Sequence, residues 1–273
     1  MPLHFRERGA DDGTGRAALV FLHYFGGSGR SWEPVMEIMA RRAFRCIAPD
    51  LRGFGESFSS CDDPSCYSVT AMAHDVLALV GHLEVEAFAL VGHSMGGKVA
   101  LALAAGQPAG LTAVVLLAPS PPTPEPLSDD ERTRLLAGYG DAAAATKTLR
   151  KITQRALSEQ LFEEAIADQL RVSEHAWRAW LDLGSREDIS AQLSGIRSPV
   201  AIAVGAADET ITESLVRREI AHRLKVPTPI HVIPDTGHLL PLEAPSAIAH
   251  FIAEAVDPET RNCPGTDDKN GKP

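Results

Sequence analysis

Aromatic side chains are scarce in this 273-residue chain, at 5% of all residues, although 44% of the residues are apolar. The core must therefore be mainly aliphatic, and the length suits one sizeable core with an inserted subdomain. Long apolar runs are also lacking, since no stretch approaches the roughly 18 residues of a membrane-spanning helix. The N-terminus, MPLHFRERGADDG, is charged from Arg6 onward and lacks the apolar segment of a signal peptide. We therefore expect a cytoplasmic protein that does not enter a membrane.

Basic residues are the minority among the charged ones. Lys and Arg total 26 against 36 Asp and Glu, which gives a formal net charge of −10. No basic cluster stands out, and this argues against binding to nucleic acid or to an anionic membrane surface. We expect a small-molecule substrate as the partner. A homodimer is compatible with the sequence, although no motif predicts one.

Cysteine is rare as well, and the four residues Cys46, Cys61, Cys66 and Cys263 do not have metal-ligand spacing. Four free thiols in a reducing cytoplasm are the favoured interpretation, with a Cys61–Cys66 disulfide as the alternative. The sequence also lacks an HExxH motif, a cluster of Cys and His, and a P-loop. We therefore expect neither a metal nor an organic cofactor.

Short apolar runs alternate with amphipathic segments along most of the chain. The runs predict strands, and the segments, with apolar residues at helical spacing, predict helices. This alternation predicts an α/β fold with a mostly parallel sheet covered by helices on both faces. Strands are expected over 3–8, 18–23, 45–48, 87–91, 112–117, 200–204 and 230–233, and helices over 31–42, 69–83, 95–105, 213–224 and 245–256.

The alternation is interrupted by the segment APSPPTPEP at residues 118–126. Proline lacks an amide hydrogen and fixes φ, so this segment cannot form a regular helix or strand. A helix-rich stretch follows, and it opens with a capping-box pattern from Ser128 to Glu131. A helical insertion at this place would cover the edge of the sheet where ligands bind. We assign residues 1–118 and 191–256 to the core, 119–190 to a helical cap, and 257–273 to a disordered tail.

The most informative segment is Gly92-His93-Ser94-Met95-Gly96, between a predicted strand and a predicted helix. It matches G-x-S-x-G, the sharp strand-to-helix turn that exposes a nucleophilic serine. Glycine is needed on both sides because side chains two residues before and after the serine would collide. Ser94 is therefore predicted to be the nucleophile, with the positive end of the following helix directed toward the site.

A serine hydroxyl is a weak nucleophile unless a base and an acid assist it. Among the ten histidines, His238 fits the base best, because it lies in a loop five residues after a predicted strand. Asp208, just after another predicted strand, fits the acid, and the order Ser94, Asp208, His238 is the one expected for this turn. Glu209 and Asp235 are the nearby alternatives to Asp208.

The segments FLHYFGGSGRSW, PDLRGFGES, GHSMGG, VGAAD and TGHLLPLEAP occur in this order. Together they resemble the α/β-hydrolase superfamily, specifically its capped serine esterase and lactonase branch. The resemblance covers about residues 3–256 apart from the cap. It implies an oxyanion hole formed by the backbone amides of Phe25 and Met95. Tyr24 stands where this family usually has glycine.

Three side chains are candidates for the substrate pocket. Tyr24 could offer its hydroxyl to the pocket or pack outward, and His93 adjoins the nucleophile. Trp177 lies on one helical face with Trp180 and Leu181, a pattern that favours packing over substrate contact.

A serine at this turn argues against epoxide opening and dehalogenation, because the relatives that catalyse them place aspartate there. The expected reaction is acyl transfer from a small-to-medium carboxylic ester or lactone to Ser94, followed by hydrolysis. Three alternatives stay open. They are a carbon–carbon bond hydrolase of aromatic-degradation products, a cofactor-free perhydrolase or haloperoxidase-like enzyme, and a receptor-like member with slow turnover.

Overall fold

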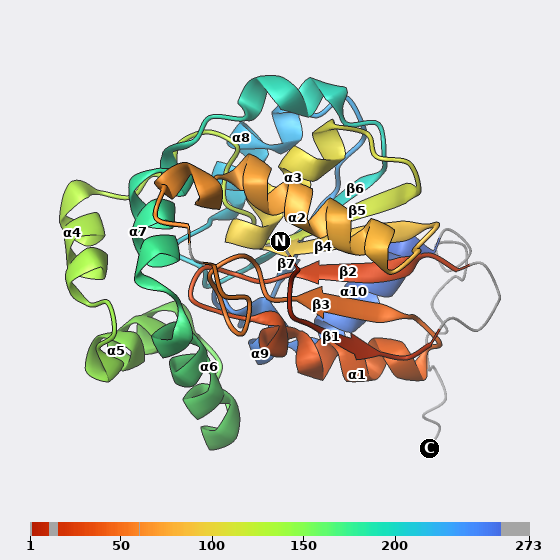
Figure 1. Cartoon of the computed structure of the whole chain (residues 1–273). Helices are drawn as coiled ribbons and strands as arrows, with labels where there is room; N and C mark the ends of the chain where they lie inside the picture. Colours follow the sequence, from red (N-terminus) through yellow and green to blue (C-terminus); the bar gives the residue numbers. More distant parts are fainter. Residues whose placement is uncertain (1, 11–15, 60, 258–273) are drawn as a thin grey trace, which may run out of the picture.

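The computed structural model describes residues 2–10, 16–59 and 61–257 of the chain (Figure 1). In this described part, seven strands form one sheet in the order β1-β3-β2-β4-β5-β6-β7. β1 pairs antiparallel with β3, and the other neighbouring strands are parallel, so the predicted α/β fold is confirmed. The strands are β1 (Phe5–Arg8), β2 (Ala18–Leu22), β3 (Cys46–Pro49), β4 (Phe88–His93), β5 (Leu111–Leu117), β6 (Val200–Gly205) and β7 (Ile230–Ile233).

The central strands are buried because their sequences are continuously apolar. β2 reads ALVFL and β5 ends in AVVLL, so neither has a polar face to present to solvent. Helices α2 and α3 cover one face of the sheet, and α1 and α10 pack together on the opposite face (Figure 1). The helices of the core are α1 (Glu33–Arg41), α2 (Val69–His82), α3 (Met95–Ala105), α8 (Glu213–Glu219), α9 (Leu240–Glu243) and α10 (Pro245–Val256).

Four further helices of the described residues lie within the segment 119–190. Each begins after a Ser or Asp whose side chain accepts a hydrogen bond from a backbone amide of the first turn. Figure 1 shows these helices together at one end of the sheet, beyond the carboxyl ends of the parallel strands. They are α4 (Asp129–Ala137), α5 (Ala142–Ile152), α6 (Glu159–Arg171) and α7 (Glu174–Asp182).

Some boundaries differ from the predicted ones. The helix expected over 31–42 divides into a 3₁₀ turn and α1, where Pro34 takes a first-turn position that needs no amide donor. The helix expected over 213–224 ends at Glu219, and a 3₁₀ turn follows. Helix α9 was not predicted, because four residues are too few to show helical periodicity. The 3₁₀ turns are η1 (Gly29–Trp32), η2 (Pro64–Tyr67), η3 (Gly184–Arg186), η4 (Ser190–Gly195) and η5 (Ala221–Arg223).

Cys61 and Cys66 form a disulfide, so the favoured prediction of free thiols is wrong for this pair. That prediction rested on the compartment, and it ignored that the turn around η2 brings two nearby cysteines together. Cys46 is a free thiol in β3, and burial raises its pKa to about 12. Cys263 and the predicted tail at 258–273 lie outside the described residues. No helix within the described ranges is long and apolar enough to cross a membrane.

The loop after β3 is held by two acidic side chains. The buried Asp50 accepts hydrogen bonds from the amides of Gly29 (2.7 Å) and Glu56 (2.9 Å). Arg52 binds the carboxylate of Asp75 in α2 with two nitrogens, at 2.7 and 2.8 Å. These contacts hold the loop against α2 and against the segment that follows β2.

Replacing Arg52 by Ala should lower the free energy of unfolding by about 1–3 kcal/mol, because the nearly buried Asp75 carboxylate loses two hydrogen bonds. Arg52→Lys should recover only part of the loss, since an ammonium group cannot reproduce the paired contact. Urea denaturation measures the change. Arg178→Ala, which removes an exposed pair with Glu174, is the control and should cost at most about 0.5 kcal/mol. An equal loss in both variants would contradict the assignment.

Candidate active site

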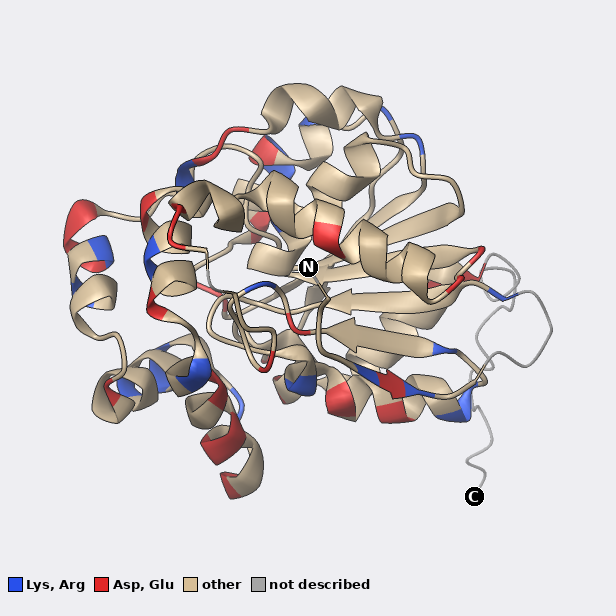
Figure 2. Ribbon diagram, in the orientation of Figure 1, with Lys and Arg blue, Asp and Glu red and all other residues tan. Residues whose placement is uncertain are grey.

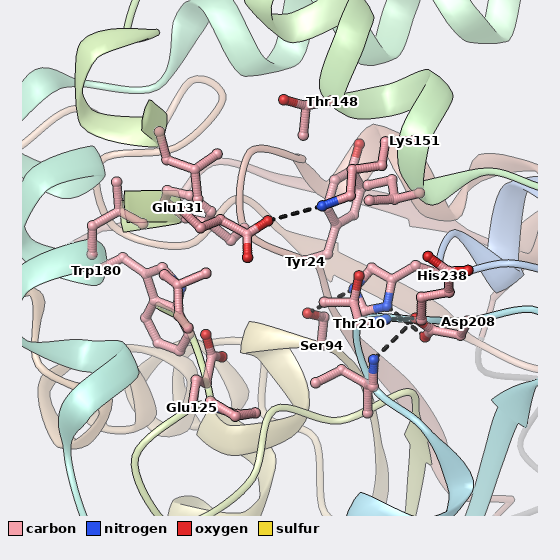
Figure 3. A pocket seen from close by; sticks show the side chains of 18 of the residues that line it. Tyr24, Ser94, Glu125, Glu131, Thr148, Lys151, Trp180, Asp208, Thr210 and His238 are labelled. Carbon is pink, nitrogen blue, oxygen red and sulfur yellow. Dashed lines mark hydrogen bonds and ion pairs between the residues drawn. The ribbon is translucent and has the colours of Figure 1, made fainter. Parts of the chain in front are cut away.

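A cavity of about 280 Å³ lies between the sheet and the helices of the 119–190 segment (Figure 3). Ser94, Asp208 and His238 line it from the sheet side. Side chains of α4, α5 and α7 line it from the other side. The loops that follow β2, β4 and β6 therefore meet at this cavity, at the carboxyl edge of the parallel strands, as is usual for ligand sites of such sheets.

Ser94 lies at the sharp turn between β4 and α3, as its motif predicts. Its φ of +52° is in the region that residues other than glycine rarely adopt. A Cβ at Gly92 would lie 2.5 Å from the carbonyl oxygen of Gly96, and one at Gly96 would overlap the carbonyl oxygen of Leu22. The two glycines are therefore required by the close approach of α3 to the ends of β2 and β4.

Ser94, His238 and Asp208 form one chain of hydrogen bonds. The Nε2 atom of His238 lies 3.0 Å from Ser94 Oγ, and its Nδ1 atom lies 2.7 Å from Asp208 Oδ2. The other oxygen of Asp208 accepts hydrogen bonds from the amides of Thr210 (2.8 Å) and Ile211 (3.0 Å). All three functional side chains are buried. The carboxylate is thus fixed by the loop after β6, and it fixes the imidazole.

The alternative acids occupy other positions. Glu209 is exposed and lines the cavity without a hydrogen bond to the imidazole in the described structure. Asp235 has φ of +51° in a turn, where its carbonyl oxygen accepts a hydrogen bond from Arg155. Asp208 is therefore the acid that the structure brings to His238.

The charges and hydrogen bonds that link Asp208 to His238 shift the pKa values of both groups. Burial alone would lower the pKa of His238, but the charge and hydrogen bond of Asp208 offset this and raise it above the ordinary value. Burial likewise opposes ionisation of Asp208, yet the charge of His238 and the hydrogen bonds lower the pKa of that carboxyl. With Nδ1–H facing Asp208, the lone pair of Nε2 faces the hydroxyl of Ser94. Such an imidazole can take the hydroxyl proton as the oxygen attacks a carbonyl group.

The backbone around His238 is held by groups far from it in the sequence. The His238 amide donates to the carbonyl oxygen of Ile152 (2.8 Å), at the end of α5. The carboxylate of the buried Glu243 accepts hydrogen bonds from the neighbouring amides of Gly237 (2.9 Å) and Leu239 (3.0 Å). Sequence analysis missed Glu243, although its place five residues after the histidine, among apolar neighbours, was a usable signal.

Glu243 also holds the segment between α5 and α6. Its Oε2 atom accepts hydrogen bonds from the amides of Gln154 and Arg155, both at 2.8 Å. One carboxylate therefore binds four backbone amides, two beside His238 and two in the 119–190 segment.

His93 does not line the cavity, contrary to expectation. Its ring is buried against the rings of Tyr24, Trp32 and His238, and its Nε2–H donates to the carbonyl oxygen of His238 (2.8 Å). Burial, together with the charge of His238, lowers the pKa of His93 to about 3. His93 is therefore neutral, and its hydrogen bond to the carbonyl oxygen of His238 holds the loop that carries His238. Sequence reasoning could place His93 beside the serine but could not tell which way its ring points.

Of the other two candidate pocket residues, Tyr24 lines the cavity and Trp177 does not. Trp177 packs against the ring of Phe25, with centroids 4.5 Å apart, and its Nε1–H donates to the carbonyl oxygen of Leu135 (3.1 Å). Trp180, on the same face of α7, lines the cavity instead. The helical pattern identified the face correctly but not which tryptophan on it meets the cavity.

The backbone amides of Phe25 and Met95 are the expected oxyanion donors. The Phe25 side chain lines the cavity, and Met95 begins α3 directly after Ser94. Within the described residues, neither backbone amide has a hydrogen-bond acceptor, so both are available to a ligand.

The loop that carries Phe25 is fixed at both ends. At its start, the buried His23 donates from Nδ1 to the carbonyl oxygen of Tyr24 (2.8 Å) and accepts from the Leu51 amide (2.9 Å) at Nε2. This arrangement needs a neutral ring, and burial lowers the pKa of His23 accordingly. At its end, Ser28 and Arg30 bind the carboxylate of Asp168 in α6.

The chain was compared with known proteins. Residues 19–251 match the model described as "Alpha/beta hydrolase family". A candidate carbamate hydrolase, RutD of Variovorax paradoxus, is 29% identical and aligns over 94% of this chain and 92% of its own. A second RutD protein, from a Caulobacter species, is 31% identical over 85% of this chain and 87% of its own.

Solved structures of other proteins have the same fold as this chain. An esterase from Exiguobacterium antarcticum superposes with a TM-score of 0.83 at 18% identity, covering 93% of this chain and 95% of that one. A thermophilic esterase from Thermogutta terrifontis gives 0.74 at 26% identity, with 92% of each chain covered. The predicted α/β-hydrolase fold is thereby confirmed.

The fall of kcat/KM at low pH, the acid limb of the pH profile, should reflect the protonation of His238. The imidazole must be neutral to accept a proton, so kcat/KM should fall as the pH drops through its pKa, above the ordinary value of about 6.5. Asp208→Asn should reduce kcat by roughly 10⁴-fold. It should also move the limb to lower pH, because burial then lowers the pKa of His238 against only the smaller opposing charges of Glu125 and Glu243. A limb that stays in place in this variant would contradict the assignment of the acid.

Glu243→Gln should lower kcat by about tenfold or more with little change in KM, because an amide nitrogen cannot accept the hydrogen bonds that position His238. Labelling of Ser94 by a neutral fluorophosphonate should slow in parallel while the circular dichroism spectrum stays that of the folded wild type, which separates positioning from unfolding. Glu254→Gln, in a partly exposed position on α10, is the charge-matched control. Unchanged labelling in Glu243→Gln would show that the residue does not position the histidine.

Proposed function

Because this chain belongs to the alpha/beta hydrolase family, we propose that it is a serine hydrolase that cleaves a small-to-medium carboxylic ester or lactone. The observation that carries the proposal is the hydrogen-bonded chain from Asp208 through His238 to Ser94, which opens into the cavity. No group of three or more His, Cys, Asp or Glu side chains in the described ranges is arranged to hold a metal ion.

The reaction follows from the roles of these groups. Ser94 Oγ attacks the substrate carbonyl carbon while Nε2 of His238 takes the hydroxyl proton, and the amides of Phe25 and Met95 stabilise the negative charge on the former carbonyl oxygen. The imidazolium then gives its proton to the departing alcohol oxygen, leaving an acyl-serine. Water, deprotonated by the same nitrogen, attacks the acyl-serine and releases the acid.

The cavity supports a substrate of modest size. Its volume of about 280 Å³ is at the low end of the range for small-molecule sites. Apolar side chains from both sides line it, and they suit a short or medium acyl group: Phe25, Leu127, Leu135, Ile152, Trp180, Leu181 and Ile211. Two of the similar solved structures are esterases, and another is an enol-lactonase from Burkholderia xenovorans, in line with this class.

A carbamate is the second candidate substrate, because the similarity to the RutD proteins extends over most of the chain. The same nucleophile and base would act on it, and the carbonyl would carry nitrogen on one side. This hypothesis differs from ester hydrolysis in the leaving group and not in the roles of Ser94 and His238.

Wild type should hydrolyse p-nitrophenyl esters with an optimum at short or medium chain length, and Ser94→Ala should abolish this activity because no acyl-serine can form. A panel from acetate to dodecanoate, extended by a phenyl carbamate and a γ-lactone, measures the preference. Mass spectrometry of the intact protein detects the acyl group. Ser198→Ala, remote from the cavity, is the matched control. Activity that persists in Ser94→Ala, or a wild type that stalls as a permanent adduct, would contradict the proposal.

A further inference from the structure

Glu125 is a cavity residue that the proposed reaction does not use. It lies in the proline-rich segment between β5 and α4, and its amide donates to the carbonyl oxygen of Ser185 (2.8 Å). Figure 3 shows its carboxyl group directed into the cavity, in the space between Ser94 and Trp180. This backbone hydrogen bond holds the segment in place, so the Glu125 carboxyl group has a fixed position in the cavity wall.

Apart from the exposed Glu209, the other charged groups that line this cavity have partners. Glu131 of α4 pairs with Lys151 of α5 at 3.0 Å (Figure 3) and with Arg134 at 3.4 Å, and all three line the cavity. Asp208 is bound by His238 and by backbone amides. Among the described residues, Glu125 has no ion-pair partner within 4 Å, although Figure 2 shows charged residues of both signs on the neighbouring cap helices.

Lys98, the buried cation whose charge acts most on Glu125, is committed elsewhere. Lys98 in α3 donates to the carbonyl oxygens of Glu187 (2.6 Å) and Thr123 (3.4 Å). Burial raises the pKa of Glu125, and the Ser120 hydroxyl and the charge of Lys98 only partly oppose this. A carboxyl group that has the Ser120 hydroxyl beside it, but no ion-pair partner within 4 Å in the described structure, can accept a further hydrogen bond from a ligand.

We infer that Glu125 is a specificity-determining residue, which accepts a hydrogen bond from an N–H or O–H group of the substrate beside the reacting carbonyl. This inference rests on the proposed function. Whether neutral or ionised, a carboxyl group keeps an oxygen that can accept such a bond. A substrate without a donor leaves an oxygen of Glu125 desolvated without this second hydrogen bond. When Glu125 is ionised, a substrate carboxylate at this place meets repulsion. The cavity therefore selects hydroxy-, amino- or carbamoyl-substituted substrates over plain or acidic ones.

Methyl 3-hydroxybutanoate and methyl butanoate differ by one donor and so measure this selectivity as a ratio of kcat/KM values. Wild type should prefer the hydroxy ester by about tenfold or more. Glu125→Leu should bring the ratio close to one, mainly by losing activity on the hydroxy ester. Glu125→Gln should keep most of the preference, because its amide oxygen still accepts. At a pH at which Glu125 is ionised, monomethyl glutarate, which carries a carboxylate, should be a poor substrate for wild type and a better one for Glu125→Gln.

Controls separate this inference from the proposed function. Labelling of Ser94 by a small neutral fluorophosphonate should proceed at a similar rate in all the Glu125 variants, which shows that they are folded. Glu163→Gln, exposed on α6, should leave the ratio unchanged. If wild type is labelled and hydrolyses both esters with the same ratio as Glu125→Leu, the inference is wrong and the proposed function stands. If wild type is neither labelled nor active on any ester, both fail.

Discussion

The close approach of helix α3 to the ends of the parallel strands is the constraint on which the rest of the site depends. At this place the Ser94 amide binds the carbonyl oxygen of Leu117 in β5, and the Gly96 amide binds that of His23 after β2. The Ser94 carbonyl oxygen accepts from the amide of Ser120, where the chain leaves the sheet. A single turn thus fixes the proposed nucleophile, the loop of Phe25 and the entrance to the 119–190 segment relative to one another.

The helices of the 119–190 segment are part of the same framework. The end of α5 provides the carbonyl oxygen that holds His238, and Glu243 joins the next two amides to the histidine loop. On the other side, Asp168 of α6 holds Ser28 and Arg30 in the loop after β2. The positions of the proposed base and of an expected oxyanion donor therefore both depend on contacts with this segment.

Much of this arrangement could be predicted from the sequence because it rests on local patterns. The glycines beside Ser94, the chain order of Ser94, Asp208 and His238, and the alternation of strands and helices each need only a short window. The direction of the His93 ring and the choice of Trp180 over Trp177 at the cavity depend on packing in three dimensions, which such windows do not contain. The Cys61–Cys66 disulfide is local, with a sequence separation of 5, and only the expected compartment argued against it. Glu125 and Glu243 were missed because a glutamate is ordinarily an exposed residue.

The contact between Ile152 and His238 has a consequence for protein engineering. Here the residues around 152–155 supply the hydrogen-bond partners of the histidine loop and of Glu243, so they belong functionally to the core. Chimaeras of this protein need their junctions inside the insertion, with α5 and the turn after it kept from the same parent as α9. Exchange confined to α4 or α7 would alter the cavity wall while preserving the support of the histidine.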